Sequence, residues 1–130
     1  MLPQTVTRAI ESDSDTATLF KLLSEVENIP RWAPVFADKI EHISDSRYRV
    51  TKNNDVFEFE VFTDPTTGTV DYIREMSQGK RGGAYIRVTP RPLGGSSISM
   101  TVPVAANTTA DDVAKVLEQE LTELIHLAQS

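Results

Sequence analysis

The chain has 130 residues, 39% of them hydrophobic and 25% charged, which is typical of a globular protein and predicts one domain over residues 1–130. A net charge of −6 argues against nucleic acid as a partner, and no apolar run reaches the roughly 18 residues of a membrane-spanning helix. The absence of cysteine excludes disulfides and thiolate chemistry, and with two histidines far apart we expect no metal and no other cofactor.

The first part of the chain predicts one strand and two short helices. Thr5–Ile10 alternates as a strand with one buried side does. Ser12–Asp15 is rich in residues that cap helices, and Ala17–Val26 has the spacing of a short amphipathic helix. We expect Pro30 to stop this helix and Arg31–Phe36 to form a second short helical turn.

The middle of the chain predicts a series of strands. Short polar turns such as Asp45-Ser46 separate them, so neighbouring strands are expected to pair antiparallel. Gln78–Gly83 is predicted to be a loop, and its glycines make it a candidate gate over a pocket. The expected strands are Lys39–Ser44, Arg47–Lys52, Val56–Thr63, Thr69–Met76, Ala84–Thr89 and Ser96–Val104.

A long amphipathic helix closes the sequence. Apolar residues from Ala110 to Ala128 recur every three or four positions, and Thr109 and Asp112 have the spacing of a capping box. The helix is about 30 Å long, so it needs a concave surface to lie in, and such a surface usually leaves a cavity. The element order predicts an α+β domain with a meandering antiparallel sheet.

This order, with Val26-Glu27-Asn28-Ile29-Pro30-Arg31-Trp32 between the two short helices, resembles the START-like superfamily. The group is also described as polyketide cyclase/dehydrase or birch-pollen-allergen-like. The resemblance implies a helix-grip fold, in which a seven-stranded antiparallel sheet wraps around the C-terminal helix and two short helices follow the first strand. It also implies a cavity between sheet and helix. Members bind lipids, sterols, hormones or aromatic polyketides, and some act as aromatases, cyclases or co-chaperones.

Alternation along the strands separates an apolar face from a polar one. We expect Arg47 and Arg49 to lie opposite Glu58 and Glu60 on the solvent-facing side, as ion pairs across two strands. The other face should meet the long helix, either as plain core or as the wall of a cavity. Its expected members are Phe57, Phe59, Val61, Ala84, Ile86, Val88, Ile98, Met100 and Val102.

Two polar positions and the single tryptophan allow more than one interpretation. If Val70 points inward, so do Tyr72 and Arg74, which would orient a ligand carboxylate or carbonyl or stabilise an enolate. In the opposite register Ile73 points inward instead. Trp32 either caps the cavity mouth or anchors the short helices to the sheet.

These patterns lead to three hypotheses for function. The first is a non-enzymatic pocket for a small hydrophobic or amphipathic molecule, lipid-like or polyketide-like. The others are a polyketide cyclase or aromatase, for which no catalytic residue is identified, and a co-chaperone-like interaction module. We expect a cytoplasmic protein, since Met1–Gln4 does not resemble an export signal, and a monomer or weak homodimer. The candidate ligand contacts are Trp32, Phe57, Phe59, Tyr72, Arg74, Ile86, Met100, Leu117 and Leu121.

Overall fold

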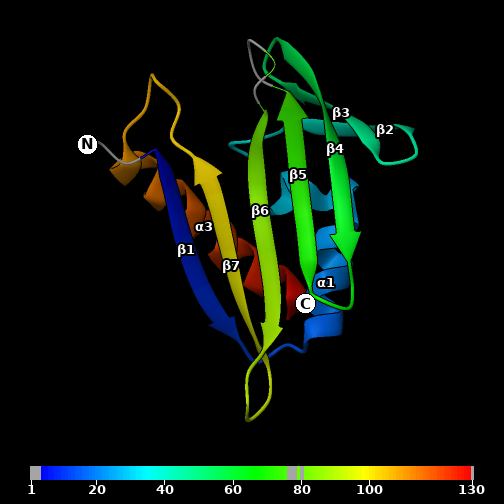
Figure 1. The fold of residues 1–130 in the computed structure, drawn as a ribbon, viewed down its shortest axis with the longest axis vertical. Helices are drawn as coiled ribbons and strands as arrows, with labels where there is room; N and C mark the ends of the chain where they lie inside the picture. The colour runs from blue at the N-terminus through cyan, green and yellow to red at the C-terminus, as the bar shows by residue number, and fades with distance from the viewer. Residues whose placement is uncertain (1–3, 76–78, 80, 130) are drawn as a thin grey trace.

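A computed structural model describes residues 4–75, 79 and 81–129. One strand, two short helices with a 3₁₀ turn between them, six further strands and a long helix follow one another along the chain (Figure 1). The elements are β1 (Thr5–Ser12), α1 (Thr16–Ser24), η1 (Val26–Asn28), α2 (Ile29–Trp32), β2 (Lys39–Ser44), β3 (Arg47–Lys52), β4 (Asp55–Asp64), β5 (Thr69–Glu75), β6 (Arg81–Pro90), β7 (Ser96–Pro103) and α3 (Ala110–Ala128).

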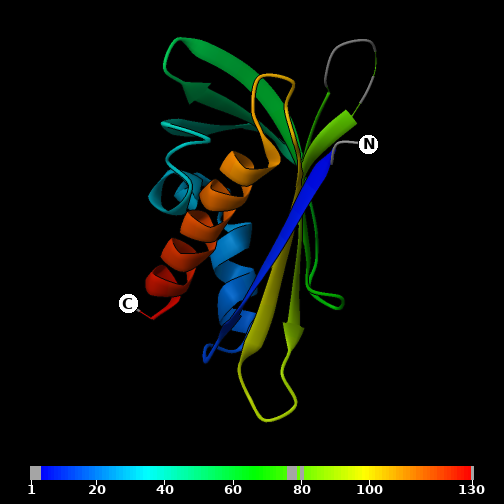
Figure 2. The ribbon, with the colours of Figure 1, turned by 90° about the vertical axis from the view of Figure 1, so that its left-hand side faces the viewer.

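The strands form one antiparallel sheet of seven strands in the order β1-β7-β6-β5-β4-β3-β2. The helices α1 and α3 lie on the same side of this sheet, and β3 and β4 lean toward that side near the start of α3 (Figure 2). This arrangement confirms the predicted helix-grip fold. None of the helices in the described residues is long and apolar enough to cross a membrane.

Both longer helices begin where the sequence places a capping residue. The Asp15 carboxylate accepts a hydrogen bond of 2.8 Å from the Thr18 amide, and the Thr109 hydroxyl accepts one of 3.2 Å from the Asp112 amide. Each bond satisfies an amide that has no partner within the helix. Along α3 the buried side chains follow the predicted apolar spacing. They are Ala114, Leu117, Leu121, Leu124 and Ile125.

The second short helix differs from its predicted position at Arg31–Phe36. It spans Ile29–Trp32, with Pro30 inside its first turn. Proline is tolerated there because the amide that it lacks would have no partner within the helix. Pro30 therefore belongs to the start of this helix instead of separating the two helices.

The strand β6 begins at Arg81, three residues before the predicted start at Ala84. Gly82 pairs with Arg74 of β5 and Gly83 pairs with Ile73, so these glycines belong to the sheet. The predicted gate loop is therefore wrong for Arg81–Gly83, and of its remaining residues Gln78 and Lys80 lie outside the described residues. Gly83 is required for space, because a Cβ atom there would lie 1.8 Å from the Tyr72 carbonyl oxygen.

The predicted ion pairs on the outer face are confirmed. Arg47 lies opposite Glu60 in the register of β3 and β4, and a guanidinium nitrogen is 2.8 Å from its carboxylate. Arg47 also approaches Glu58 at 3.4 Å, and Arg49 approaches Glu58 at 4.0 Å. Exposed pairs of this kind contribute about 0.2–1 kcal/mol each, so they support the register of the strands more than the stability of the fold.

We predict that Gly83→Ala lowers the free energy of unfolding by about 2 kcal/mol or more, because the new methyl group meets the backbone of β5. Gly79→Ala is the comparison, since nothing lies within 4 Å of its Cβ position and only its positive φ opposes alanine, at about 1 kcal/mol. Urea denaturation followed by circular dichroism measures both. Equal losses for the two variants would contradict the close approach of β5 and β6.

Candidate functional site

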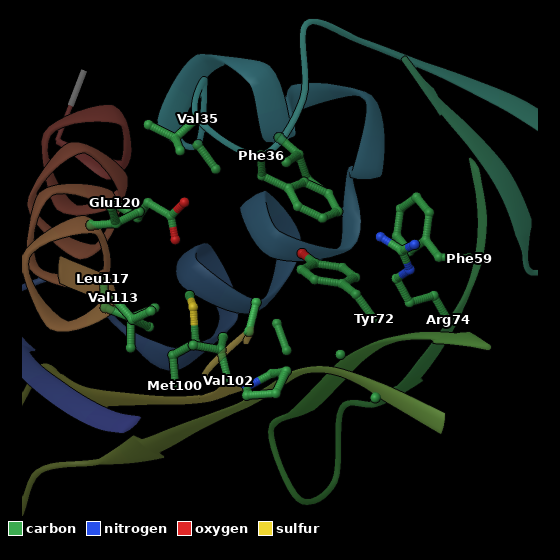
Figure 3. Close-up of a pocket in the computed structure, with 18 of the residues that line it drawn as sticks. Val35, Phe36, Phe59, Tyr72, Arg74, Met100, Val102, Val113, Leu117 and Glu120 are labelled. Carbon is green, nitrogen blue, oxygen red and sulfur yellow. The ribbon is translucent and has the colours of Figure 1, made fainter. Parts of the chain in front are cut away.

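A cavity of about 470 Å³ lies between the sheet and the N-terminal half of α3 (Figure 3). Its walls come from β4 to β7, from α2 and the segment after it, and from α3. Most of the surrounding side chains are apolar. The lining residues are Ile29, Trp32, Ala33, Val35, Phe36, Phe57, Phe59, Tyr72, Arg74, Gly82, Gly83, Ala84, Met100, Val102, Pro103, Ala105, Thr108, Asp112, Val113, Val116, Leu117 and Glu120.

Small residues explain why this space is not filled. The wall contributed by β6 is the run Gly82–Ala84, and α3 presents Val113 and Val116 where leucine or phenylalanine would reach further. Toward the other end of α3, Leu121 and Leu124 are buried in the hydrophobic core. The small residues on β6 and α3 therefore leave part of this space unfilled.

The structure answers the question of register in β5. Val70 and Tyr72 are buried on the helix side and Arg74 lines the cavity, so this face points inward. Ile73 is also buried, but its side chain is on the opposite face of the sheet, where it lines a second pocket.

Most of the candidate ligand contacts surround the cavity, whereas Ile86 and Leu121 lie in the core and are not part of its lining. Those that line the cavity are Trp32, Phe57, Phe59, Tyr72, Arg74, Met100 and Leu117.

Trp32 is buried as an anchor of the short helices would be, and it also lines the cavity. Its side chain is buried, with 3% exposure, and joins the hydrophobic core beneath α2. The same side chain lines the cavity, and its indole nitrogen has no hydrogen-bond partner among the described residues. Trp32 thus anchors α2 and leaves one buried donor beside the cavity.

Tyr72 is buried, and its hydroxyl group is already engaged. The hydroxyl donates a hydrogen bond of 2.7 Å to the Leu23 carbonyl near the end of α1, and burial raises the pKa of Tyr72. The ring packs edge-on against Phe59, with 5.8 Å between the ring centres. The hydroxyl proton that could polarise a ligand carbonyl is already donated to the Leu23 carbonyl. Tyr72 therefore contributes its ring, and not its hydroxyl group, to the wall of the cavity.

Arg74 is the cation in the cavity wall. Its guanidinium carbon lies 4.0 Å from the centre of the Phe57 ring, a cation–π contact. The Nε atom is buried without a hydrogen-bond partner, and no ion pair joins Arg74 to a carboxylate of the described residues. Arg74 therefore retains donors that a ligand can use.

Glu120 is a functional candidate that the sequence analysis missed. Its carboxyl group points into the cavity from α3, on the wall opposite Arg74 (Figure 3). Burial raises the pKa of Glu120 to about 7, so near neutral pH this group both donates and accepts protons. The sequence does contain evidence for this position. Glu120 lies three residues after Leu117 and four before Leu124, which places it on the apolar face of the helix.

The described part of the chain has no group of three or more His, Cys, Asp or Glu side chains that could hold a metal ion. Among the described residues, the charged side chains that line this mostly apolar cavity are Arg74 on β5 and Asp112 and Glu120 on α3.

Solved structures share this architecture. A START superfamily protein from Mycobacterium smegmatis superposes with a TM-score of 0.73 at 14% identity, covering 98% of this chain and 98% of the other. The Zhui aromatase/cyclase from a Streptomyces species gives a TM-score of 0.67 at 14% identity, covering 97% and 93%. Ara h 8.0201 gives 0.64 at 14% identity, covering 96% and 97%.

No protein-family profile matches the sequence, and no curated protein sequence matches it. The similarity to the solved structures confirms the expected START-like helix-grip fold over almost the entire chain. At this level of identity the likeness concerns the fold alone.

We predict that Tyr72→Phe lowers the free energy of unfolding by about 1–1.5 kcal/mol, because the Leu23 carbonyl loses its buried donor. Tyr85→Phe is the matched control, since its ring is exposed on the outer face, and we expect it to change stability by less than about 0.5 kcal/mol. Urea titration of both variants measures the difference. If Tyr72→Phe left the free energy of unfolding unchanged, this hydrogen bond would not be what holds α1 against the sheet.

We predict that Glu120→Gln raises stability at pH 8 but not at pH 4. The folded-state pKa of about 7 lies above the ordinary value of 4.5, so the folded protein keeps a proton that the unfolded chain releases, and wild-type stability falls as pH rises between these values. The variant should exceed the wild type by about 1–3 kcal/mol at pH 8, with equal stability at pH 4. Urea denaturation across this pH range tests it, and a constant difference at every pH would contradict a buried Glu120.

Proposed function

We propose that the protein binds a small hydrophobic or amphipathic molecule in the cavity between the sheet and α3. The observation that carries the proposal is the cavity itself, about 470 Å³ with mostly apolar walls, Arg74 on the sheet side, and Asp112 and Glu120 on α3. Ligand sites in proteins commonly occupy about 300–1,000 Å³ and combine apolar walls with a few polar groups that orient the ligand.

The proposed contacts divide by chemistry. The rings of Trp32, Phe57 and Phe59 supply flat apolar surface, and Met100 and Leu117 supply adaptable aliphatic surface. Arg74 and Glu120 orient polar atoms of the ligand. The fold shared with a START superfamily protein and with an aromatase/cyclase supports a pocket protein. We propose that it acts in the cytoplasm as a monomer or weak homodimer.

A second candidate is an aromatase/cyclase-type enzyme, favoured by Glu120. A carboxyl group with a pKa of about 7 in an apolar cavity is suited to general acid–base catalysis, and Arg74 would stabilise an enolate oxygen. The solved structures with this fold include the Zhui aromatase/cyclase. Glu120→Gln separates the two functions: an enzyme would lose turnover while keeping its ligand, whereas a carrier would have no turnover to lose.

We predict that Ala84→Phe weakens binding of the neutral fluorescent probe N-phenyl-1-naphthylamine by about tenfold or more, because the added ring occupies the cavity. Ala9→Phe is the matched control, since Ala9 is exposed and pairs with Ser99 on the outer face of the sheet. Fluorescence titration measures both affinities. The proposal fails if the wild type does not bind the probe with saturation, or if both variants bind it as the wild type does.

A further inference from the structure

The sheet opens between β4 and β5. Their pairing runs from Asp64 with Thr69 to Glu60 with Ile73 and stops there. The first half of β4, from Asp55 to Phe59, pairs with β3 alone. We call the resulting gap, between residues 57–59 of β4 and residues 74–75 of β5, the sheet opening.

A second pocket, of about 500 Å³, lies at the sheet opening. It is mostly polar, in contrast to the cavity. Its lining residues are Arg47, Phe57, Glu58, Phe59, Glu60, Ile73, Arg74, Glu75 and Arg81. Among the described residues, Phe57, Phe59 and Arg74 line both spaces. These three side chains therefore form the boundary between the apolar cavity and a polar pocket on the other side of the sheet.

The polar pocket is lined by three arginines, Arg47, Arg74 and Arg81, and by three carboxylates, Glu58, Glu60 and Glu75. Arg81 lies opposite Glu75 in the register of β5 and β6. Arg47 is paired with Glu58 and Glu60 at 3.4 and 2.8 Å, whereas Arg74 stacks on the face of Phe57 and forms no ion pair with any described residue. A stacked guanidinium keeps its N–H groups free at the edge, in the planar arrangement that suits a carboxylate. A partly buried cation without a partner is unfavourable, so an anion that reaches it is stabilised.

The position of Glu120 fixes the direction of the ligand. Glu120 lies on the wall opposite Arg74 and Asp112 lines the cavity from the same helix, so a ligand carboxylate beside α3 would be repelled or would have to be protonated. An acidic ligand is therefore favoured with its charge at Arg74 and its apolar part toward α3.

We propose that the ligand is an amphipathic monocarboxylate whose carboxylate lies in the sheet opening against Arg74, with its chain or rings in the cavity. This rests on the proposed function and adds a head-group chemistry and an orientation. Because the polar pocket shares Arg74 with the cavity, we expect a larger head group to extend past Arg74 into that pocket without displacing the apolar part.

Competition against bound N-phenyl-1-naphthylamine tests the head group with a matched pair, decanoate and decanol. At pH 8 the wild type should bind decanoate about tenfold more tightly than decanol. Arg74→Met should abolish that preference while leaving decanol affinity within about threefold. Arg49→Met is the control, because Arg49 belongs to the lining of neither space, and it should keep the preference.

The outcomes separate the two proposals. Absence of probe binding by the wild type overturns the proposed function, whereas probe binding without a preference for decanoate overturns only the carboxylate inference. If circular dichroism shows that Arg74→Met does not fold, the wild-type protein provides a second measurement. The pKa of the carboxyl group of ¹³C-labelled decanoate, followed by NMR, should fall on binding if this group contacts Arg74. An unchanged or raised carboxyl pKa contradicts the inference.

The orientation has its own test, N-decanoyltaurine, which carries a longer anionic head on the same chain. We expect it to displace the probe within about threefold of decanoate, because the head extends into the polar pocket. A loss of about tenfold or more would show that the head group is enclosed, and the opening would not be its site.

Discussion

The long helix α3 buries apolar side chains along its whole length, but its N-terminal half also borders a cavity. Leu121, Leu124 and Ile125 are buried in the core at one end, whereas Val113 and Val116 leave space at the other. The strand facing that space contributes Gly82–Ala84, which adds little volume. Protein interiors are normally packed as densely as organic crystals, so unfilled space of this size depends on the choice of small side chains on both walls.

Arg74 and Glu120 line the same cavity, and its apolar walls change the properties of both charged groups. Arg74 and Glu120 lie on opposite walls, and each is removed from much of the solvent. Low polarity strengthens any hydrogen bond that they form with a ligand and makes them unfavourable without one. Tyr72, between them, is committed to the fold through Leu23. On the same face of β5, Tyr72 thus contributes to the stability of the fold, and Arg74 is the residue that we propose for binding.

The fold was predictable because local patterns determine it. Alternation in β4 assigned Phe57 and Phe59 to the inner face, and the three- and four-residue spacing placed Leu117 on the buried side of α3. The size of the cavity was not predictable, because it depends on which small residues meet across elements far apart in the sequence. Gly82 was predicted to lie in a loop, so the wall of the cavity that β6 forms was not predicted.

Glu120 and the sheet opening were missed for different reasons. The position of Glu120 on the apolar face of α3 was available from the sequence, since Leu117 and Leu124 flank it at helical spacing. The opening follows from where β4 and β5 stop pairing at Glu60 and Ile73, and alternation does not reveal where pairing ends.

The most direct test is a solution NMR titration of the wild-type protein with N-phenyl-1-naphthylamine, observed through side-chain methyl groups. A ligand in the cavity should shift the methyl resonances of Met100, Val113 and Leu117 with saturation. Those of Ile98 and Leu124, buried outside the lining, should change little. Saturable shifts confined to methyl groups outside the cavity, or no saturable shift, would contradict a ligand-binding cavity beneath α3.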